Sequence, residues 1–140
     1  NSTDEKIIHA TFSILQKEGF TKATTKKIAA EAGVNEVTIF RKFKNKNNLI
    51  EVTKAYYTQQ IIETLADVFD FTGEEEIGEY LQKNFYGLLE IPDEDFAIIK
   101  VAMEEMGDPS ERKHLIALIT DSVLDKYEAY FNIQKEKGIQ

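Results

Sequence analysis

Apolar residues recur every three or four positions along the whole chain, with polar residues between them. The first such stripe contains Ile7, Ala10, Ile14 and Leu15. This spacing places apolar side chains on one face of a helix, whereas a strand needs apolar and polar residues to alternate. No stretch of useful length alternates in that way. The pattern therefore predicts an all-α fold.

Start and stop signals divide this pattern into seven predicted helices. Ser, Thr, Asp or Asn caps a helix start, Pro favours the first helical position, and Gly ends a helix. These signals predict helices over residues 2–19, 26–32, 36–43, 46–69, 72–91, 93–107 and 108–138. Ser2 with Glu5, and Thr72 with Glu75, are expected to form capping boxes. The acidic run at residues 74–76 is expected in the first turn of the fifth helix, where the helix dipole favours it.

Residues 24–46 have the spacing of a helix-turn-helix. Ala29 is the small residue where two helices cross, Gly33 tolerates a positive φ in the turn, and Ile39 is an apolar anchor. The outward stripe of the third predicted helix consists of Glu36, Val37, Phe40, Arg41 and Lys44. This stripe has the position to enter a major groove of DNA. A helical hairpin with a basic edge is the plainer alternative, and the Ala-x-x-x-Gly spacing alone favours it.

With the upstream helix and the downstream aromatic-lysine spacing, the pattern resembles the tetracycline-repressor-like (TetR) family of transcriptional regulators. The matching residues are Ile7, Ala10, Gly19, Phe20, Ala23, Thr24, Thr25, Ile28, Ala29, Ala32, Gly33, Val34, Thr38, Ile39, Phe43, Lys46 and Leu49. The match covers roughly the first third of the chain. It implies a three-helix DNA-binding domain over residues 1–46 and a helical ligand-binding and dimerisation domain over residues 47–140.

The resemblance also implies roles for individual residues. Phosphate contacts are implied for Thr25, Lys26, Thr38 and Lys46, and base or groove contacts for Glu36, Val37 and Arg41. Phe40 departs from the family, which often has a tyrosine there, so its role is either packing or contact with a thymine methyl. Glu36 either accepts from a cytosine amino group or repels phosphate and tunes specificity. The lysines around the third helix have an alternative role as solubilising surface residues.

Charge is divided unevenly along the chain. Its net charge is −8, yet residues 1–54 carry ten Lys and Arg against six Asp and Glu. The remaining residues carry seven basic and nineteen acidic side chains. A basic head can bind phosphates while an acidic body stays away from them. The expected partner is therefore duplex DNA, and a near-palindromic operator if the protein is a homodimer, as the resemblance implies.

For the second half, the resemblance implies a pocket for a small, mostly apolar effector. The candidates for its lining are Tyr57, Tyr86, Met103 and Tyr127, although aromatic residues at helical spacing usually pack a core. Family members continue into further helices that form a dimer interface. We therefore expect that this chain is incomplete at its C-terminus, or that it dimerises through other surfaces.

Other classes of protein have weaker support. The chain has no Cys, and His9 and His114 lack metal-ligand spacing, so neither a metal site nor a cofactor is expected. Glu104 and Glu105 with His114 are the one conceivable catalytic cluster, and a solvated helix edge explains them better. A helical interaction module with a vestigial head is the second alternative. No apolar run approaches the ~20 residues of a membrane span, so the expected location is the cytoplasm.

Overall fold

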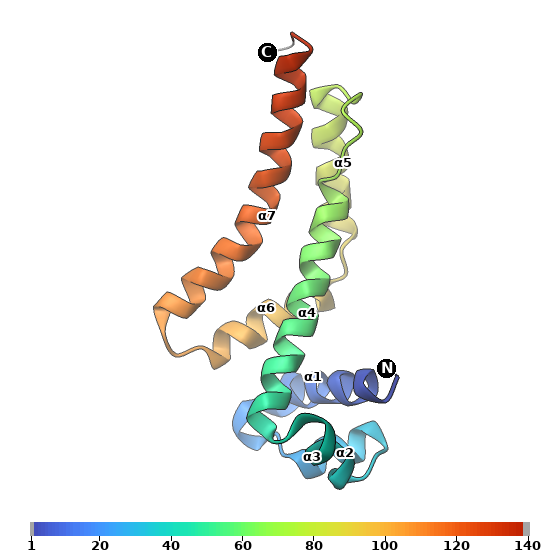
Figure 1. Cartoon of the computed structure of the whole chain (residues 1–140), viewed down its shortest axis with the longest axis vertical. Helices are drawn as coiled ribbons and strands as arrows, with labels where there is room; N and C mark the ends of the chain where they lie inside the picture. Colours follow the sequence, from blue (N-terminus) through green and yellow to red (C-terminus); the bar gives the residue numbers. More distant parts are fainter. Residues whose placement is uncertain (1, 139–140) are drawn as a thin grey trace. The chain divides into compact units, whose positions relative to one another are not determined.

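The computed structural model describes residues 2–138, and these residues form helices and connecting turns only (Figure 1). The helices are α1 (Ser2–Lys22), α2 (Thr25–Ala32), α3 (Glu36–Phe43), α4 (Lys46–Val68), α5 (Ile77–Glu90), α6 (Asp93–Glu105) and α7 (Pro109–Glu136). The predicted all-α fold is confirmed.

Most predicted helix ends agree with the structure because they depend on local signals. Gly19 has φ 80° and ψ 176°, so the regular part of α1 ends there as expected. The Asp108 side chain caps α7 by accepting from the Ser110 N–H at 2.9 Å. Ser2 is the first residue of α1 rather than a cap outside it.

The fifth helix begins later than predicted. Thr72 and Glu75 do interact, since the Glu75 carboxylate accepts from the Thr72 N–H at 2.9 Å, from the Thr72 hydroxyl at 3.0 Å and from the Gly73 N–H at 2.9 Å. These bonds close a separate turn, in which Gly73 has φ 97°. Because that turn is not helical, the acidic run at residues 74–76 precedes α5, and Glu76 occupies the cap position without a side-chain cap bond.

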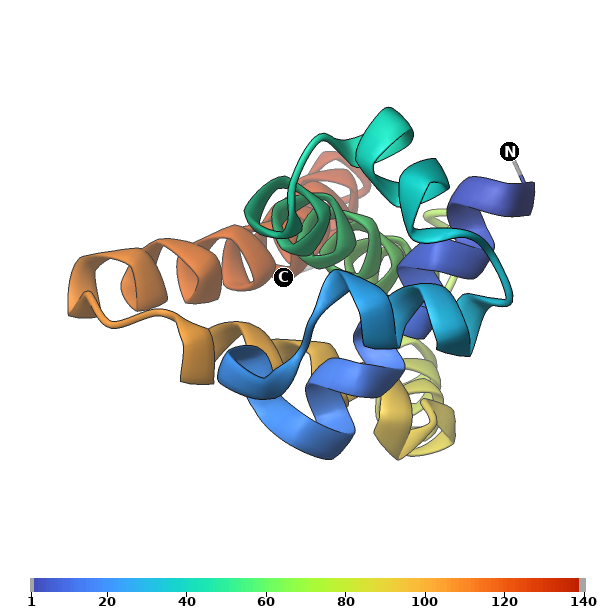
Figure 2. The ribbon, with the colours of Figure 1, turned by 90° about the horizontal axis from the view of Figure 1, so that it is seen from below.

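The chain forms two compact units. Unit 1 contains residues 1–59 and 96–105, and unit 2 contains residues 60–95 and 106–140. The core of unit 1 includes fully buried residues from three parts of the chain, such as Ile7, Ile28 and Leu49, together with Ile98 and Val101 of α6. Figure 2 shows α2 and α3 of this unit (blue to teal) joined by their short turn. These units are defined by packing, whereas the domain boundary that the sequence predicts after residue 46 separates a DNA-binding from a regulatory function. That boundary stays a prediction.

Unit 2 is built around stacked aromatic rings. Tyr80 and Tyr130 are fully buried, and their ring centroids lie 4.2 Å apart with the planes 20° from parallel. The Tyr80 hydroxyl donates to the Phe69 carbonyl at 2.5 Å, so the end of α4 is bonded to α5. Buried hydroxyls need such partners, because an unpaired one loses its bonds to water without replacement.

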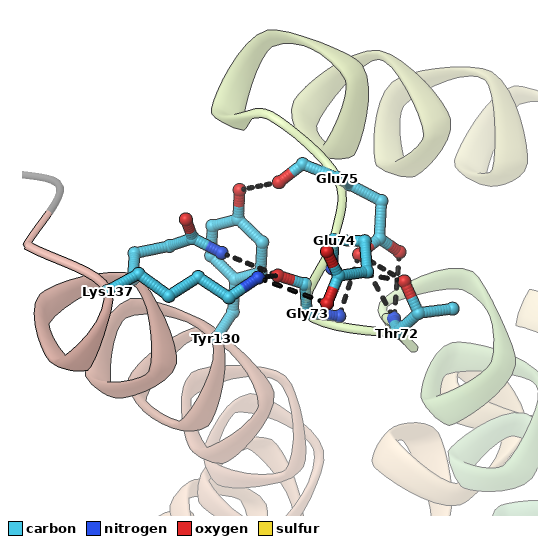
Figure 3. Close-up of polar contacts among 7 residues, drawn as sticks. Thr72, Gly73, Glu74, Glu75, Tyr130 and Lys137 are labelled. Atoms are coloured by element: carbon cyan, nitrogen blue, oxygen red, sulfur yellow. Dashed lines mark hydrogen bonds and ion pairs between the residues drawn. The ribbon is translucent and has the colours of Figure 1, made fainter.

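The turn between α4 and α5 is held by α7 (Figure 3). The Tyr130 hydroxyl donates to the Glu75 carbonyl at 2.8 Å, and Gln134 Nε2 donates to the Gly73 carbonyl at 3.2 Å. Lys137 Nζ also donates to the Gly73 carbonyl and forms an ion pair with Glu74 at 3.3 Å. Three side chains of one helix end therefore fix this turn.

Glu75→Gln is expected to make thermal stability less sensitive to acid. Backbone hydrogen bonds, chiefly from Thr72, lower the pKa of Glu75 from 4.5 to about 2. A carboxyl whose folded pKa is depressed stabilises the fold above its unfolded pKa, and this stabilisation is lost as the pH falls toward the folded pKa. The wild-type melting temperature should therefore fall more steeply than that of the variant between about pH 5 and about pH 3.

The matched control is Glu128→Gln, which removes an exposed carboxylate of α7 in the same unit. This control should keep the wild-type acid sensitivity. If the melting temperatures of all three proteins fall equally across this pH range, the bonds to Glu75 contribute nothing to the stability of the fold.

Candidate nucleic-acid interface

The turn between α2 and α3 depends on the residues that the spacing predicts. Thr24 caps α2, its hydroxyl accepting from the Lys27 N–H at 3.1 Å. Gly33 ends α2 with φ 72° and ψ 31°, a left-handed conformation that costs glycine little because it has no Cβ. The N–H of the next residue, Val34, donates to the Ala29 carbonyl at 3.0 Å. The two helices are therefore connected at a defined angle by a short, bonded turn.

The two faces of α3 differ sharply in exposure. Ile39 is 0% exposed and packs with Phe43 in the core of unit 1, whereas Val37 is 68% exposed and Phe40 is 45% exposed. Arg41 is exposed on α3, and so is Lys44 directly after it. Asn35 caps this helix by accepting from the Val37 N–H at 2.9 Å. The predicted outward stripe is thus on the surface, apart from Glu36, which is half-buried.

The basic residues of the head, residues 1–59, fall into two groups. Ion pairs with acidic side chains occupy four lysines: Lys17 with Glu31, Lys27 with Glu18, Lys42 with Asp4, and Lys54 with Glu51 and Glu105. Within residues 2–138, no ion pair involves Lys6, Lys22, Lys26, Arg41, Lys44 or Lys46. All four basic residues predicted to contact DNA are therefore in the second group, with their charge not neutralised by the protein.

Two predicted phosphate contacts have partners inside the protein. Lys46 is half-buried, and its Nζ donates to the Phe20 carbonyl at 2.8 Å, which ties the start of α4 to the end of α1. The Thr25 hydroxyl donates to Glu36 Oε2 at 2.6 Å, which ties the first turn of α2 to the first turn of α3. Thr38 is half-buried on α3. Sequence reasoning missed both bonds because each joins residues that are distant along the chain.

Asn45 is a further residue that the spacing did not single out. Its side-chain oxygen accepts from the Asn48 N–H at 2.8 Å, so it caps the start of α4. The Asn48 side chain in turn donates to the Phe43 carbonyl at 2.7 Å. In the sequence, this cap could have been recognised from Asn45, an asparagine directly before the predicted start of the fourth helix. These two bonds connect the end of α3 to α4.

Lys54 connects α4 to α6 inside unit 1. Its Nζ lies 2.7 Å from Glu105 Oε2 and 2.8 Å from Glu51 Oε1, and its side chain is 12% exposed. Burial lowers the pKa of Lys54, but the hydrogen bonds that its ammonium donates to Glu105 and Glu51, with the attraction of their charges, outweigh burial and raise the pKa above the usual lysine value. Glu104 pairs with Lys100 at 4.0 Å. Glu104 and Glu105, the acidic members of the conceivable catalytic cluster with His114, are thus both paired with lysines.

The four candidate effector contacts are divided between the units. Tyr57 and Met103 belong to unit 1, and Tyr86 and Tyr127 belong to unit 2. The Tyr57 hydroxyl is 2.5 Å from His9 Nδ1, and burial, aided by Tyr56, raises the pKa of Tyr57 to about 12. The Tyr127 hydroxyl donates to Asn84 Oδ1 at 3.1 Å. Tyr86 is 54% exposed and packs edge-on against Phe85. Neither unit contains all four.

Residues 7–53 match the family described as bacterial regulatory proteins, tetR family. Over 49 residues the chain is 49% identical to the uncharacterized HTH-type transcriptional regulator YvkB of Bacillus subtilis (strain 168). That alignment covers 35% of this chain and 26% of the relative, so the chain matches about a quarter of the relative's length.

Solved structures have a similar fold over nearly the whole chain. A TetR family transcription regulator from Marinobacter aquaeolei VT8 matches with a TM-score of 0.71 and 21% identity, over 96% of this chain and 70% of that one. A TetR family protein from Vibrio parahaemolyticus matches with a TM-score of 0.68 and 19% identity, over 97% of this chain and 71% of that one. These similarities extend the shared fold beyond the helix-turn-helix. Within the described residues, no helix is both long and apolar enough to cross a membrane.

Proposed function

We propose that this chain, whose residues 7–53 match the tetR family of bacterial regulatory proteins, is a ligand-responsive repressor that binds duplex DNA in the cytoplasm. One observation carries the DNA-binding part of this proposal. Lys26 of α2, Arg41 of α3 and Lys44 directly after α3 are exposed and form no ion pair among the described residues. The other head lysines with acidic partners, Lys42 of α3 among them, are neutralised. Unneutralised cations beside an exposed helix suit a polyanion that receives the helix in its major groove.

We propose two kinds of contact on this surface. Lys26 and Lys44 bind phosphates and position the head, while Arg41 and Val37 reach base edges from α3. Lys46 adds a phosphate contact near its bond to the Phe20 carbonyl, because an ammonium has three donors. Thr38 and Phe40 complete the contact surface.

A short recognition helix reads few base pairs, so useful specificity requires two heads. We propose that the full protein is a homodimer on a near-palindromic operator, with reading heads about 34–36 Å apart, or further if the DNA is deformed. Sedimentation of the intact gene product on its operator measures the stoichiometry. Two protomers per operator are expected, and a monomer would contradict the dimer.

Titration of the chain with labelled duplex DNA at several salt concentrations tests the DNA-binding proposal. The affinity for random-sequence duplex should fall as salt rises, in proportion to the number of phosphates contacted. Selection from a random duplex library should also enrich a defined sequence, because Arg41 and Val37 read bases. Binding that is independent of salt, or absent at low salt, would leave the helical interaction module as the better explanation.

We further propose that a small, mostly apolar effector weakens DNA binding by displacing α4. The candidate contacts are Tyr57 and Met103 for an effector bound in unit 1, and Tyr86 and Tyr127 for an effector bound in unit 2. Helix α4 begins in the head and continues into unit 2, and part of α6 belongs to the same unit as the head. An effector acts if it binds better to the conformation that misfits DNA, and linkage then requires DNA to weaken effector binding equally.

Lys54→Met is expected to loosen the attachment of α6 to the head. Losing a charge-assisted hydrogen bond of this kind costs about 1–2 kcal/mol, which corresponds to roughly 5- to 30-fold faster amide exchange through local opening. Hydrogen exchange over residues 96–105 measures this directly, without any effector.

Lys100→Met is the matched control, because Lys100 is an exposed lysine whose pair with Glu104 spans 4.0 Å. It should leave exchange of residues 96–105 almost unchanged. Equal exchange in Lys54→Met and wild type would show that apolar packing alone holds α6 against α4.

A further inference from the structure

Glu36 is the one acidic residue on the predicted DNA-facing stripe, and a hydroxyl holds its side chain. It is the first residue of α3, and its Oε2 accepts from Thr25 Oγ1, on the first residue of α2, at 2.6 Å. Thr24, not Thr25, supplies the cap of α2. The Thr25 hydroxyl is thus used for Glu36, and both residues are half-buried.

No basic side chain within residues 2–138 forms an ion pair with Glu36. In the head, Asp4, Glu18, Glu31 and Glu51 each form an ion pair with a lysine. Across the described residues, no such pair involves Glu36 or Glu5. A hydroxyl orients a carboxylate without cancelling its charge. The fold therefore presents an oriented negative charge at the front of α3.

We infer that Glu36 determines DNA sequence specificity and that Thr25 is its positioning residue. This inference rests on the proposed DNA binding. A carboxylate that faces phosphate or a base acceptor is repelled, whereas the amino group of cytosine, or of adenine, can donate to it in the major groove. Glu36 therefore weakens binding to most DNA sequences, but not to those that present an amino group at one position. It sets specificity by repelling the other sequences.

Thr25 acquires a different role from the phosphate contact that the family resemblance implies. Its hydroxyl proton already has an acceptor, and moving it to a phosphate would free the carboxylate to rotate. As a positioning residue it affects base preference, whereas a phosphate contact affects all sequences alike.

Glu36→Gln separates charge from shape, because the amide oxygen still accepts from Thr25. The probes are a random-sequence duplex and the duplex that wild-type protein selects from a random library. At about 0.1 M salt, affinity for the random duplex should rise roughly 5- to 10-fold, the effect of about one phosphate charge. Affinity for the selected duplex should rise less or fall, so the ratio of the two affinities shrinks.

Glu5→Gln is the control for net charge, since it removes an exposed carboxylate of the same unit that forms no ion pair with any described residue. It should change neither affinity by as much as twofold. Equal effects of Glu5→Gln and Glu36→Gln on the random duplex would overturn the inference, because long-range charge would then explain both.

Thr25→Val keeps the side-chain shape and removes the donor. Library selection with this variant should lose preference at one base position while random-duplex affinity stays the same, and Thr25→Ser should restore the preference. Combined with Glu36→Gln, Thr25→Val should add no further change. Melting temperatures of all variants confirm that they are folded.

Two outcomes distinguish a failure of the positioning role from a failure of the proposed DNA binding. If Thr25→Val weakens binding to both duplexes alike, Thr25 is a phosphate contact and the positioning role is wrong, while the proposed DNA binding stands. If wild-type protein binds neither duplex, the proposed function fails and the inference fails with it.

Discussion

Lys26→Ala combined with Lys44→Ala is expected to weaken binding to any duplex by about 10- to 100-fold at about 0.1 M salt. Both side chains are exposed, and neither forms an ion pair in the described part of the chain. Each phosphate contact releases counterions, and losing two contacts should make the slope of log affinity against log salt shallower by about 2. Titrations at four or more salt concentrations measure both quantities.

The matched control is Lys17→Ala with Lys27→Ala, which removes the same charge from the same unit. Both of these lysines are already neutralised, by Glu31 and Glu18 at 3.1 Å. The control should leave the salt slope within about half a unit of wild type, because surface ion pairs of this kind contribute little. Similar slopes for the two double variants would show that net charge, and not the surface beside α3, drives binding.

Tyr80→Ala is expected to destabilise unit 2 by about 3–5 kcal/mol, the range for removing a buried aromatic side chain. The fully buried ring stacks on Tyr130 and its hydroxyl bonds the Phe69 carbonyl, so truncation leaves both a cavity and an unpaired carbonyl. Tyr80→Phe keeps the ring and should cost about 1 kcal/mol. Urea denaturation gives the free energy of unfolding of each variant.

Leu89→Ala serves as the control on the same helix, because Leu89 is 66% exposed. It should change the free energy of unfolding by less than about 0.5 kcal/mol. A loss of unfolding free energy as large as that from Tyr80→Ala would mean that the exposed side of α5 is covered in solution. Burial within unit 2 would then not predict how much each side chain stabilises the fold.

The sequence by itself determined the features that depend on neighbouring residues. Thr24, Asn35 and Asp108 cap helices by bonding N–H groups two or three positions away, so their effect is readable from local order. Gly33 adopts a positive φ for the same local reason, and Ile39 is buried because helical spacing sets which side of α3 faces in. The helix-turn-helix and the family resemblance followed from this short-range information.

Only the tertiary structure decided which distant residues meet. Thr25 bonds Glu36, Lys54 pairs with Glu105, and Tyr130 of α7 fixes the turn before α5, and no local pattern encodes these distances. Thr72 and Glu75 show the limit most clearly. Their mutual bonds were predictable, but whether those bonds start a helix or close a separate turn depended on the backbone of Gly73 and its contacts with α7. Ion pairs and turns of this kind depend on how whole helices pack, because packing sets the distances between their side chains.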